Sequence, residues 1–371
     1  MRIYVCHTYY HSYIAFLKEL KIRADTASVS AGIATDGAIL VLSRMSNDFE
    51  DLASRVRATG VFSEVVEYDE KREDYFDELG PLRQDTGSMV GNLRNRIRFT
   101  KRFAQLQEQF VPACLKAANV REAAKRGETD IYVFCDIDPI GTYLSQNRIY
   151  YHAVEDGLDC LSAYDTARVS NAGHFGVKRF LSEKLNLIFI SEGYNKYCLD
   201  MEVNDKSKIK YPHSKQIEVP RKQLTARLTA EDKDDLLHAY VKNLPELKAK
   251  ISECMGVGAI LILTDPLCDL ESRERIFRDI IDMYKAEGTI FIKPHPRDVL
   301  DYKTIFADYP QFDRTLPMEM LNFFPGLRFK KVVGVFTQMG AIECADECIQ
   351  LGSDFMDKYE AHDKHNWNEK I

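Results

Sequence analysis

Four short groups of residues in this chain combine side-chain types that suit group transfer. The first, Glu155-Asp156-Gly157, joins two adjacent carboxylates to a glycine that lets the backbone turn tightly. A carboxylate that is partly withdrawn from water and lies beside a second one has a raised pKa, so it can take a proton from a hydroxyl. On its own, the tripeptide is more commonly a solvated turn before a helix. It is therefore a candidate general base that needs support from its position.

A histidine between two prolines forms the second group, Lys293-Pro294-His295-Pro296. The prolines hold the histidine in extended backbone and remove two N–H donors from its surroundings. A fixed imidazole beside a lysine suits a phosphate, because histidine can donate a hydrogen bond or a proton to a departing phosphate oxygen. A histidine in a proline turn is more often structural, so this group is also a candidate only.

The other two groups stand at expected helix starts. After Pro317, Glu319 places a carboxylate in a first helical turn. There it could accept hydrogen bonds from ribose hydroxyls, or it could serve only to favour the helix dipole. Thr337 and Gln338 precede an expected helix whose free backbone amides would hold a phosphate. The plainer role of Thr337 is that of an N-cap.

These groups follow β-strands in a chain that alternates strand and helix patterns. The alternation predicts parallel sheets wrapped by helices, with ligands at the carboxyl ends of the strands. The expected strands are 2–6, 39–42, 62–67, 130–135, 148–154, 186–191, 259–264, 289–293 and 331–336. The expected helices are 51–57, 91–126, 139–146, 229–254, 270–286, 318–323 and 340–350, and 208–220 mixes strand and loop.

Length and composition limit the classes of protein to which the chain can belong. Its 371 residues exceed one small core, so we expect two domains, 1–250 and 251–371. A net charge of -7 argues against a nucleic-acid partner. The nine cysteines are scattered and lack metal-binding spacing, which favours reduced thiols and no metal site. Neither a signal peptide nor a membrane-spanning apolar run is evident, so we expect a cytoplasmic protein, with peripheral contact to the inner face of a membrane left open.

The order of the four groups resembles that of the bacterial sialyltransferases. Over residues 148–350 the chain presents an acidic pair with glycine, a strand followed by His-Pro, a Pro-x-Glu helix start and a strand followed by threonine. It is similar in particular to the lipooligosaccharide sialyltransferases of glycosyltransferase family 52 and to the related capsular polysialyltransferases, which share the first two motifs. The resemblance implies an α/β fold of the GT-B type, in which two Rossmann-like domains face each other across a cleft.

The reaction that the resemblance implies is transfer of sialic acid from CMP-sialic acid to a glycan hydroxyl, with inversion, in surface-polysaccharide or lipooligosaccharide synthesis. Glu155 would be the base that deprotonates the acceptor, Asp156 would assist, and His295 would protonate or stabilise the departing CMP phosphate. No cofactor or metal is expected beyond the donor, because CMP leaves with a single phosphate. The residues implied at the donor are Thr264, Lys293, Pro296, Pro317, Glu319, Thr337 and Gln338.

Three features qualify this assignment. The family usually has two serines where this chain has Thr337-Gln338, which leaves the identity of the donor open. Asp136-Ile137-Asp138 has the spacing of a metal site, although capping of a helix at residue 139 is its more common use. For the acceptor we expect contacts from His7, Thr8 and Tyr9, which follow the first strand and combine aromatic rings with hydroxyls.

Two other functions fit the same residues. A glycerophosphotransferase of the CDP-glycerol type also presents a Lys-x-His-Pro element to a cytidine nucleotide. A non-catalytic sugar- or nucleotide-binding protein could use the same scaffold without turnover. The joint presence of Glu155 and His295 favours an enzyme, and the acidic pair favours sialyl transfer. The sequence does not determine the acceptor, the linkage or the oligomeric state.

Overall fold

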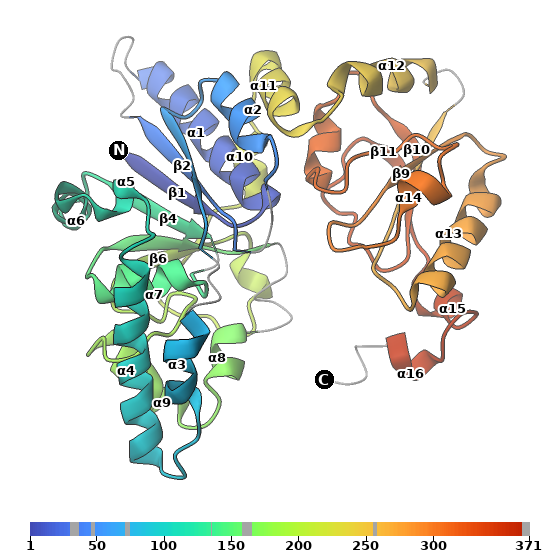
Figure 1. The fold of residues 1–371 in the computed structure, drawn as a ribbon. Coiled ribbons are helices and arrows are strands. Elements are labelled where there is room, and N and C mark those ends of the chain that lie inside the picture. Colours follow the sequence, from blue (N-terminus) through green and yellow to red (C-terminus); the bar gives the residue numbers. More distant parts are fainter. Residues whose placement is uncertain are drawn as a thin grey trace. The chain divides into compact units, whose positions relative to one another are not determined.

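The protein is described by a computed structural model, which covers residues 1–29, 37–45, 49–70, 75–134, 136–157, 165–254 and 258–365. The chain divides into two compact units, Met1–Asp232 and Lys233–Ile371, which we call unit 1 and unit 2. Each unit has its own parallel sheet with helices packed around it (Figure 1). This confirms the α/β class and the two Rossmann-like domains. The division lies at residue 232, earlier than the expected residue 250, because the helical stretch between them belongs with unit 2.

Unit 1 has a seven-stranded parallel sheet in its described part, in the order β3-β2-β1-β4-β5-β6-β7. Its strands are β1 (Arg2–Cys6), β2 (Ala38–Ser43), β3 (Glu64–Tyr68), β4 (Asp130–Phe134), β5 (Tyr151–Val154), β6 (Cys198–Val203) and β7 (Gln216–Glu218). Its helices are α1 (Tyr9–Val29), α2 (Leu52–Ala58), α3 (Tyr75–Arg83), α4 (Met89–Gln107), α5 (Ala113–Lys116), α6 (Ala118–Lys125), α7 (Pro139–Gln146), α8 (Thr166–Ser170), α9 (Phe175–Glu183), the 3-10 turn η1 (Lys206–Lys208) and α10 (Arg221–Thr225). The strand order reverses between β1 and β4, and ligands of such sheets bind beside this point at the carboxyl ends of the strands.

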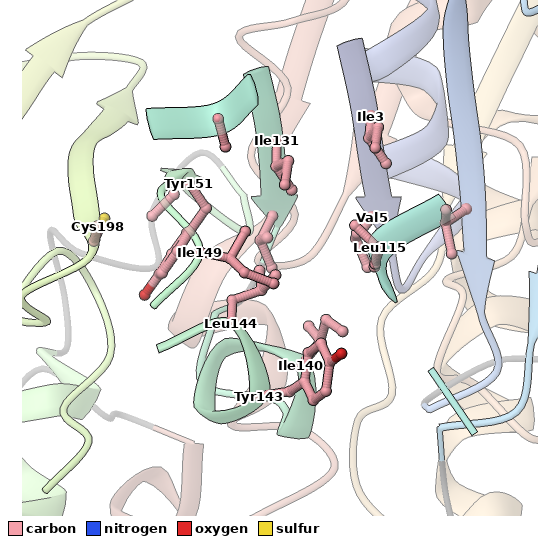
Figure 2. Close-up of a cluster of buried hydrophobic side chains, with 14 of the residues drawn as sticks. Ile3, Val5, Leu115, Ile131, Ile140, Tyr143, Leu144, Ile149, Tyr151 and Cys198 are labelled. Carbon is pink, nitrogen blue, oxygen red and sulfur yellow. The ribbon is translucent and has the colours of Figure 1, made fainter. Parts of the chain in front are cut away.

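The core of unit 1 fixes the ends of β1 and β4 against α7. Ile3 and Val5 of β1 and Ile140 and Leu144 of α7 are all buried in one cluster (Figure 2). The strands are apolar on both faces because helices cover both sides of a parallel sheet. A Cβ on Gly141 would lie 2.0 Å from the carbonyl oxygen of residue 136, so only glycine lets α7 approach the loop after β4 this closely.

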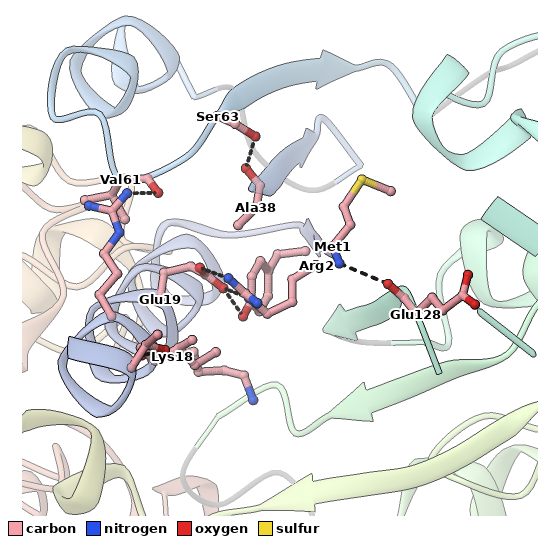
Figure 3. Close-up of polar contacts among 12 residues, drawn as sticks. Met1, Arg2, Lys18, Glu19, Ala38, Val61, Ser63 and Glu128 are labelled. Atoms are coloured by element: carbon pink, nitrogen blue, oxygen red, sulfur yellow. Dashed lines mark hydrogen bonds and ion pairs between the residues drawn. The ribbon is translucent and has the colours of Figure 1, made fainter. Parts of the chain in front are cut away.

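The amino ends of β1 and β4 are tied by polar contacts (Figure 3). Arg2 donates two hydrogen bonds to the Glu19 carboxylate of α1, at 2.7 and 3.0 Å. The same carboxylate accepts the hydroxyl of Tyr4 at 2.6 Å. The N-terminal amine of Met1 donates to the carbonyl of Glu128, just before β4, at 3.0 Å. These contacts of charged groups hold the amino ends of the two strands together. The polar groups of the candidate site lie at the carboxyl ends of the same strands.

Unit 2 has a four-stranded parallel sheet among its described residues, in the order β11-β10-β8-β9. Its strands are β8 (Ala259–Leu263), β9 (Thr289–Lys293), β10 (Phe329–Gly334) and β11 (Ala345–Gln350). Its helices are α11 (Ala230–Tyr240, at the boundary), α12 (Leu244–Cys254), α13 (Leu270–Tyr284), α14 (Tyr302–Ile305), the 3-10 helix η2 (Met318–Phe323), α15 (Gly352–Met356) and α16 (His362–His365). The apolar face of α13 buries Ile276, Phe277 and Ile280 against the β8 residues Ile260 and Ile262.

The expected helix over 340–350 is wrong, because Ala345–Gln350 is strand β11, paired in parallel with β10. The apolar residues in this stretch also fit a helical spacing, and the choice between the two conformations is made by a neighbouring strand that lies near in space. No helix begins after Thr337, since residues 337–339 have no regular structure. The phosphate site that we expected at a helix start is therefore not formed in that way.

Three other expected elements differ from the structure. The helix expected over 91–126 is divided into α4, α5 and α6. Residues 186–191 form no strand, and Ile188 and Ile190 are buried in a small cluster beside α8 and α9 without a pairing strand. The single helix expected over 229–254 is two helices, α11 and α12, separated at residues 241–243. Asn243 has a left-handed backbone (φ 54°), and a proline follows at the second position of α12, so the helix cannot continue through this point.

Candidate active site

The carboxyl edge of the unit 1 sheet carries a buried chain of polar groups beside the β1/β4 switch point. His7 follows β1, and its backbone N–H donates to Nδ1 of His11 in the first turn of α1, at 3.1 Å. The other ring nitrogen of His11, Nε2, is hydrogen-bonded to the carboxylate of Asp156, which follows β5. The ring of His11 stacks on Phe134 at the end of β4. Three strands of the sheet thus converge on one imidazole–carboxylate pair.

The contacts of His11 define its tautomer. Burial lowers the pKa of His11, whereas the hydrogen bond and charge of Asp156 raise it. The effect of burial is larger, so the neutral ring is favoured. Because Nδ1 accepts a backbone N–H, the proton of the neutral ring is on Nε2 and is donated to Asp156. The side chain of Asp156 is 48% exposed, whereas that of His11 is 1% exposed. A buried donor therefore orients a carboxylate that solvent and ligands can reach.

His7 is held in turn by carboxylates from two other loops. Its Nε2 donates to Glu70 after β3 at 3.0 Å and lies 3.5 Å from Asp138 after β4. Burial disfavours the charged ring, but the hydrogen bond to Glu70 and the charges of Glu70 and Asp138 outweigh it and raise the pKa of His7. Burial raises the pKa of Asp138 to about 6. This cluster forms the rigid support behind His11.

The expected capping role of Asp138 belongs to Glu70. Asp138 stands at the N-cap position of α7, but its side chain makes no capping hydrogen bond. Glu70 instead accepts the backbone N–H of Ile140 in the first turn of α7. Asp136 is also engaged inside unit 1, since it accepts the N–H of Glu192 at 2.7 Å and the hydroxyl of Tyr151 at 2.9 Å. In the described part of the chain, no group of three or more potential ligands is arranged to hold a metal ion.

Glu155 and Asp156 have different surroundings although they are adjacent. Glu155 is 4% exposed, and its Oε2 accepts the backbone N–H of Asn204, after β6, at 2.9 Å. Asp156 is the exposed member of the pair. Gly157 has ordinary backbone geometry and open space where a Cβ would lie, so the tight turn that we expected does not require glycine here. The acidic pair is thus one buried carboxylate that ties β5 to β6 and one that faces outward.

A buried guanidinium, that of Arg221, lies at the start of α10, the helix that follows β7. The backbone N–H of Arg221 donates to the side chain of Asn204, the residue that also binds Glu155. All three side-chain nitrogens of Arg221 are inaccessible to solvent, and none has a hydrogen-bond partner among the described residues. A buried cation without a partner is unfavourable unless an anion pairs with it. This makes Arg221 a candidate contact for an anionic group.

In unit 2, the His-Pro loop presents one nitrogen of His295. The backbone N–H of His295 donates to the hydroxyl of Thr264, after β8, at 3.0 Å. Nδ1 of the ring accepts the backbone N–H of Arg297 at 3.1 Å. Burial, followed by the charge of Arg297, lowers the pKa of His295. The neutral ring therefore carries its proton on Nε2, for which no hydrogen bond to a described residue is recorded.

The base of the His-Pro loop is a buried ion pair that sequence patterns did not indicate. Arg273 of α13 donates to Asp298 at 2.5 Å, and both side chains are almost fully buried. Asp298 also accepts the hydroxyl of Tyr302 at 2.8 Å, and its backbone N–H donates to the carbonyl of His295 at 3.0 Å. The carboxylate thereby fixes the loop that carries the imidazole.

Lys293 is a structural cation of this edge. Its ammonium group donates to the carbonyls of Pro294 and Arg314, at 3.1 and 3.0 Å, and the residue is 5% exposed. Burial lowers its pKa to about 8, while the charges of Asp313 and Glu319 act in the opposite direction. The charge of Glu319, in the first turn of η2, thus acts on the Lys293 ammonium group, and the contact of Glu319 with a ribose stays a prediction. The other two expected donor residues of the neighbouring loops, Pro296 and Pro317, are exposed and buried respectively.

Thr337 is joined to the carboxylate of Asp265. Asp265 follows β8 and accepts the backbone N–H groups of Phe336 and Thr337 at 3.0 and 3.2 Å. It also accepts the hydroxyl of Thr337 at 2.5 Å. While this bond holds, the hydroxyl has no proton to donate to a phosphate. Gln338, the next residue, is exposed.

The residues expected to bind the acceptor are engaged within unit 1. Besides the contacts of His7, the hydroxyl of Thr8 accepts the N–H of His11 at 3.1 Å, which caps α1. Tyr9 is 5% exposed, its hydroxyl donates to the carbonyl of Phe49 at 2.9 Å, and its ring packs on that of Phe49. These side chains position His11 and the start of α1, and their contact with an acceptor stays a prediction.

Sequence reasoning missed His11, Glu70 and Arg221. His11 could have been found, because it is four residues after His7 and both follow the end of the first expected strand. The others have no local signal, since each gains its partner from a distant loop. Among the described residues, no helix is long and apolar enough to cross a membrane.

The chain matches the model of glycosyltransferase family 52 over residues 89–339, more than half of its length. It is 31% identical over 137 residues to an uncharacterized protein of Haemophilus influenzae, and the match covers 36% of this chain and 40% of that protein. The chain thus spans less than half of that relative.

Several solved structures are similar to this chain. A sialyltransferase from Photobacterium damsela has a TM-score of 0.48 and 12% identity, covering 94% of this chain and 73% of that one. An alpha/beta-galactoside alpha-2,3-sialyltransferase from Photobacterium phosphoreum has a TM-score of 0.45 and 12% identity, covering 94% and 89%. A UDP-GlcNAc 2-epimerase from Methanocaldococcus jannaschii has a TM-score of 0.45 and 11% identity, covering 97% and 91%.

Proposed function

The chain belongs to glycosyltransferase family 52, and from this premise we propose that it transfers sialic acid from CMP-sialic acid to a hydroxyl of a glycan. The transfer inverts the configuration at the anomeric carbon and takes place on the cytoplasmic side during synthesis of a surface glycan. The observation that carries the proposal is the state of His295. Its backbone N–H donates to Thr264 and its ring Nδ1 accepts the N–H of Arg297, which leaves the Nε2–H available to a ligand. A departing CMP needs one such donor at its phosphate.

The proposed leaving-group step uses His295 as a donor to the phosphate oxygen. In the free protein the lowered pKa of the ring favours the neutral form. A bound phosphate brings negative charge beside the imidazole, which raises its pKa and favours proton donation as the bond to the sugar breaks. Thr337 and Lys293 act indirectly in this scheme, because both are bound to groups of the protein that shape the loop.

For the acceptor side we assign the general base to Asp156. A base must touch the hydroxyl that it deprotonates, and Asp156 is the accessible member of the acidic pair. The hydrogen bond from His11 fixes one of its oxygens. Glu155, to which the family resemblance assigns the base, would then hold the strand end in place through Asn204. Arg221 supplies positive charge near this loop for an anionic group of a substrate.

The test is release of CMP from CMP-sialic acid by the purified protein, with and without lactose and with and without a chelator. We expect release that depends on lactose, that persists in chelator, and that falls about 10²–10⁴-fold in His295→Ala. The matched control is His238→Ala, which removes an exposed histidine of α11 that contacts Asp234 of the same helix. Equal activity of the two variants would contradict the role of His295.

The same assay separates the alternative functions. Release of CMP from CDP-glycerol, but not from CMP-sialic acid, would establish the glycerophosphotransferase. Binding of CMP without turnover of either donor would establish a non-catalytic nucleotide-binding protein. Formation of a sialylated product, identified by its mass, would establish the proposed transfer.

A further inference from the structure

A large pocket lies within unit 1, apart from the polar groups described above. It has a volume of about 880 Å³ and is lined by residues of α3, α4, α7 and α8 and by the segment after α9. We call it the α4 pocket and define it by Arg83, Asn95, Arg96, Phe99, Ile137 and Asn171. The volume is within the range of about 300–1,000 Å³ that is typical of ligand sites.

The charged groups of the α4 pocket give it a positive character. Arg96 is partly buried and donates to the side chain of Asn171 and to the carbonyl of Phe189. The guanidinium of Arg83 lies 4.9 Å from the centre of the Phe99 ring. The carboxylate among the lining residues, Asp85, is taken up by its own loop, where it accepts the N–H of Gly87 and the amide of Asn92, both at 2.9 Å. An anionic ligand would therefore meet two guanidinium groups and one carboxylate that is already satisfied.

The remaining lining residues suit a carbohydrate. Phe99 and Phe103 lie together, with ring centres 5.5 Å apart, and provide apolar faces on which a sugar ring can lie. The side-chain amide of Asn95 and the hydroxyls of Ser170 and Ser191 provide both donors and acceptors. This mixture of aromatic faces and neutral polar groups is what a ring carrying several hydroxyls requires.

The α4 pocket is connected to the candidate base through the loop after β4. Ile137 lines it and is 45% exposed. This residue lies between Asp136 and Asp138 in the loop after β4, and Asp138 is 3.5 Å from His7. The backbone of His7 binds His11, which in turn holds Asp156. A chain of sugars whose terminal hydroxyl is at Asp156 could therefore continue along the same edge of the sheet into the pocket.

We propose that the α4 pocket binds the non-reacting part of the acceptor, an oligosaccharide that carries an anionic group, phosphate or carboxylate, at a distance from the reacting hydroxyl. The inference rests on the proposed function, since it takes that hydroxyl to be deprotonated at Asp156. Arg83 and Arg96 pair with the anion, and Phe99 contacts a ring of the saccharide. The pocket thereby selects among acceptors that share the same terminal sugar.

The experiment compares three acceptors with the same terminal galactose: lactose, lactose 1-phosphate and lactobionate. We expect kcat/KM to be roughly tenfold higher for the acceptors that carry an anion, and Arg83→Gln to remove most of this preference. The control is Arg98→Gln, which makes the same charge change at an exposed position of α4 outside the pocket. The response of phosphate and carboxylate acceptors to Arg83→Gln identifies the anion that is preferred.

Two further readouts separate failure of this proposal from failure of the proposed function. Release of CMP from CMP-sialic acid by the wild type with lactose, which carries no anion, tests the transfer chemistry apart from the pocket. Binding of lactose 1-phosphate, followed by calorimetry, tests the pocket without turnover and should weaken in Arg83→Gln only. Equal binding by the wild type and both variants, or equal use of the three acceptors by the wild type, would overturn the assignment of the pocket even if sialyl transfer were established.

Discussion

The imidazole of His11 is hydrogen-bonded to the carboxylate of Asp156, a residue 145 positions later in the chain. The contact joins the first turn of α1 to the end of β5, and its geometry is fixed by the backbone N–H of His7 on the opposite side of the ring. A neutral imidazole that is buried behind an exposed carboxylate can orient that carboxylate by a hydrogen bond and leave it negatively charged. His11 is therefore a positioning residue for the proposed base.

Replacing His11 by phenylalanine should lower kcat by about 10–100-fold, as loss of an orienting partner commonly does. The KM for CMP-sialic acid should not change, because the donor is assigned to unit 2. His11→Gln keeps an N–H donor and should restore part of the rate. His152→Gln is the control, since His152 is also paired with an aspartate, Asp200, in the same sheet. Equal loss of rate in His11→Phe and His11→Gln would argue against an orienting role.

The two carboxylates of the acidic pair should respond differently to neutralisation. We expect Asp156→Asn to lower kcat by about 10²–10⁴-fold while leaving thermal unfolding almost unchanged. Glu155→Gln should mainly weaken the hydrogen bond to the backbone of Asn204 and lower the melting temperature. Initial rates and melting curves of both variants provide the measurement. A larger loss of rate in Glu155→Gln than in Asp156→Asn would return the base to Glu155.

The buried pair of Arg273 and Asp298 should support the stability of unit 2. Asp298→Asn leaves the guanidinium of Arg273 without a charged partner and should destabilise the fold by about 3–5 kcal/mol. Tyr302→Phe removes one neutral donor to the same carboxylate and should cost about 1 kcal/mol. Denaturant unfolding monitored for each variant measures both values. Similar stability of Asp298→Asn and the wild type would show that the pair is dispensable.

Stability of unit 1 should fall as the pH rises through the titration of Glu192. Burial raises its pKa to about 8 from an ordinary value of 4.5, and the charges of Asp136 and Asp165 act in the same direction. The folded state thus binds this proton more tightly than the unfolded state. The resulting stabilisation is complete below about pH 4.5 and is lost as the pH rises to about 8.

Glu192→Gln should therefore raise the melting temperature at pH 8 by on the order of 5 °C and have little effect at pH 5. Glu122→Gln, at a fully exposed position of α6, is the control and should produce no such rise. Melting curves at pH 5, 6.5 and 8 give the comparison. A wild-type melting temperature that does not decrease relative to Glu192→Gln between pH 5 and 8 would contradict the assignment.

The sequence by itself determined the parallel α/β architecture, most strand positions and the places where polar residues follow strands. Arg2–Cys6, Pro139–Gln146 and Thr289–Lys293 occur as predicted, because buried strands and proline-led helices have strong local patterns. The motifs at Glu155 and His295 could be recognised for the same reason, because each directly follows a strand that the local sequence predicts. The match to family 52 over residues 89–339 confirms the family that these motifs indicated.

The tertiary structure decided which of these residues meet and what each can do. Ala345–Gln350 became a strand because β10 lies beside it, and Thr337 lost the role of a helix start as a result. His11, Asp265 and Asp298 gained their partners from loops that are distant in sequence, and no local pattern encodes such pairings. Hydrogen-bond partners also set the tautomers of His11 and His295, and burial set the direction of their pKa shifts. The types of residue at the site could thus be identified from the sequence, whereas their protonation states and hydrogen-bond partners depend on neighbours that only folding brings together.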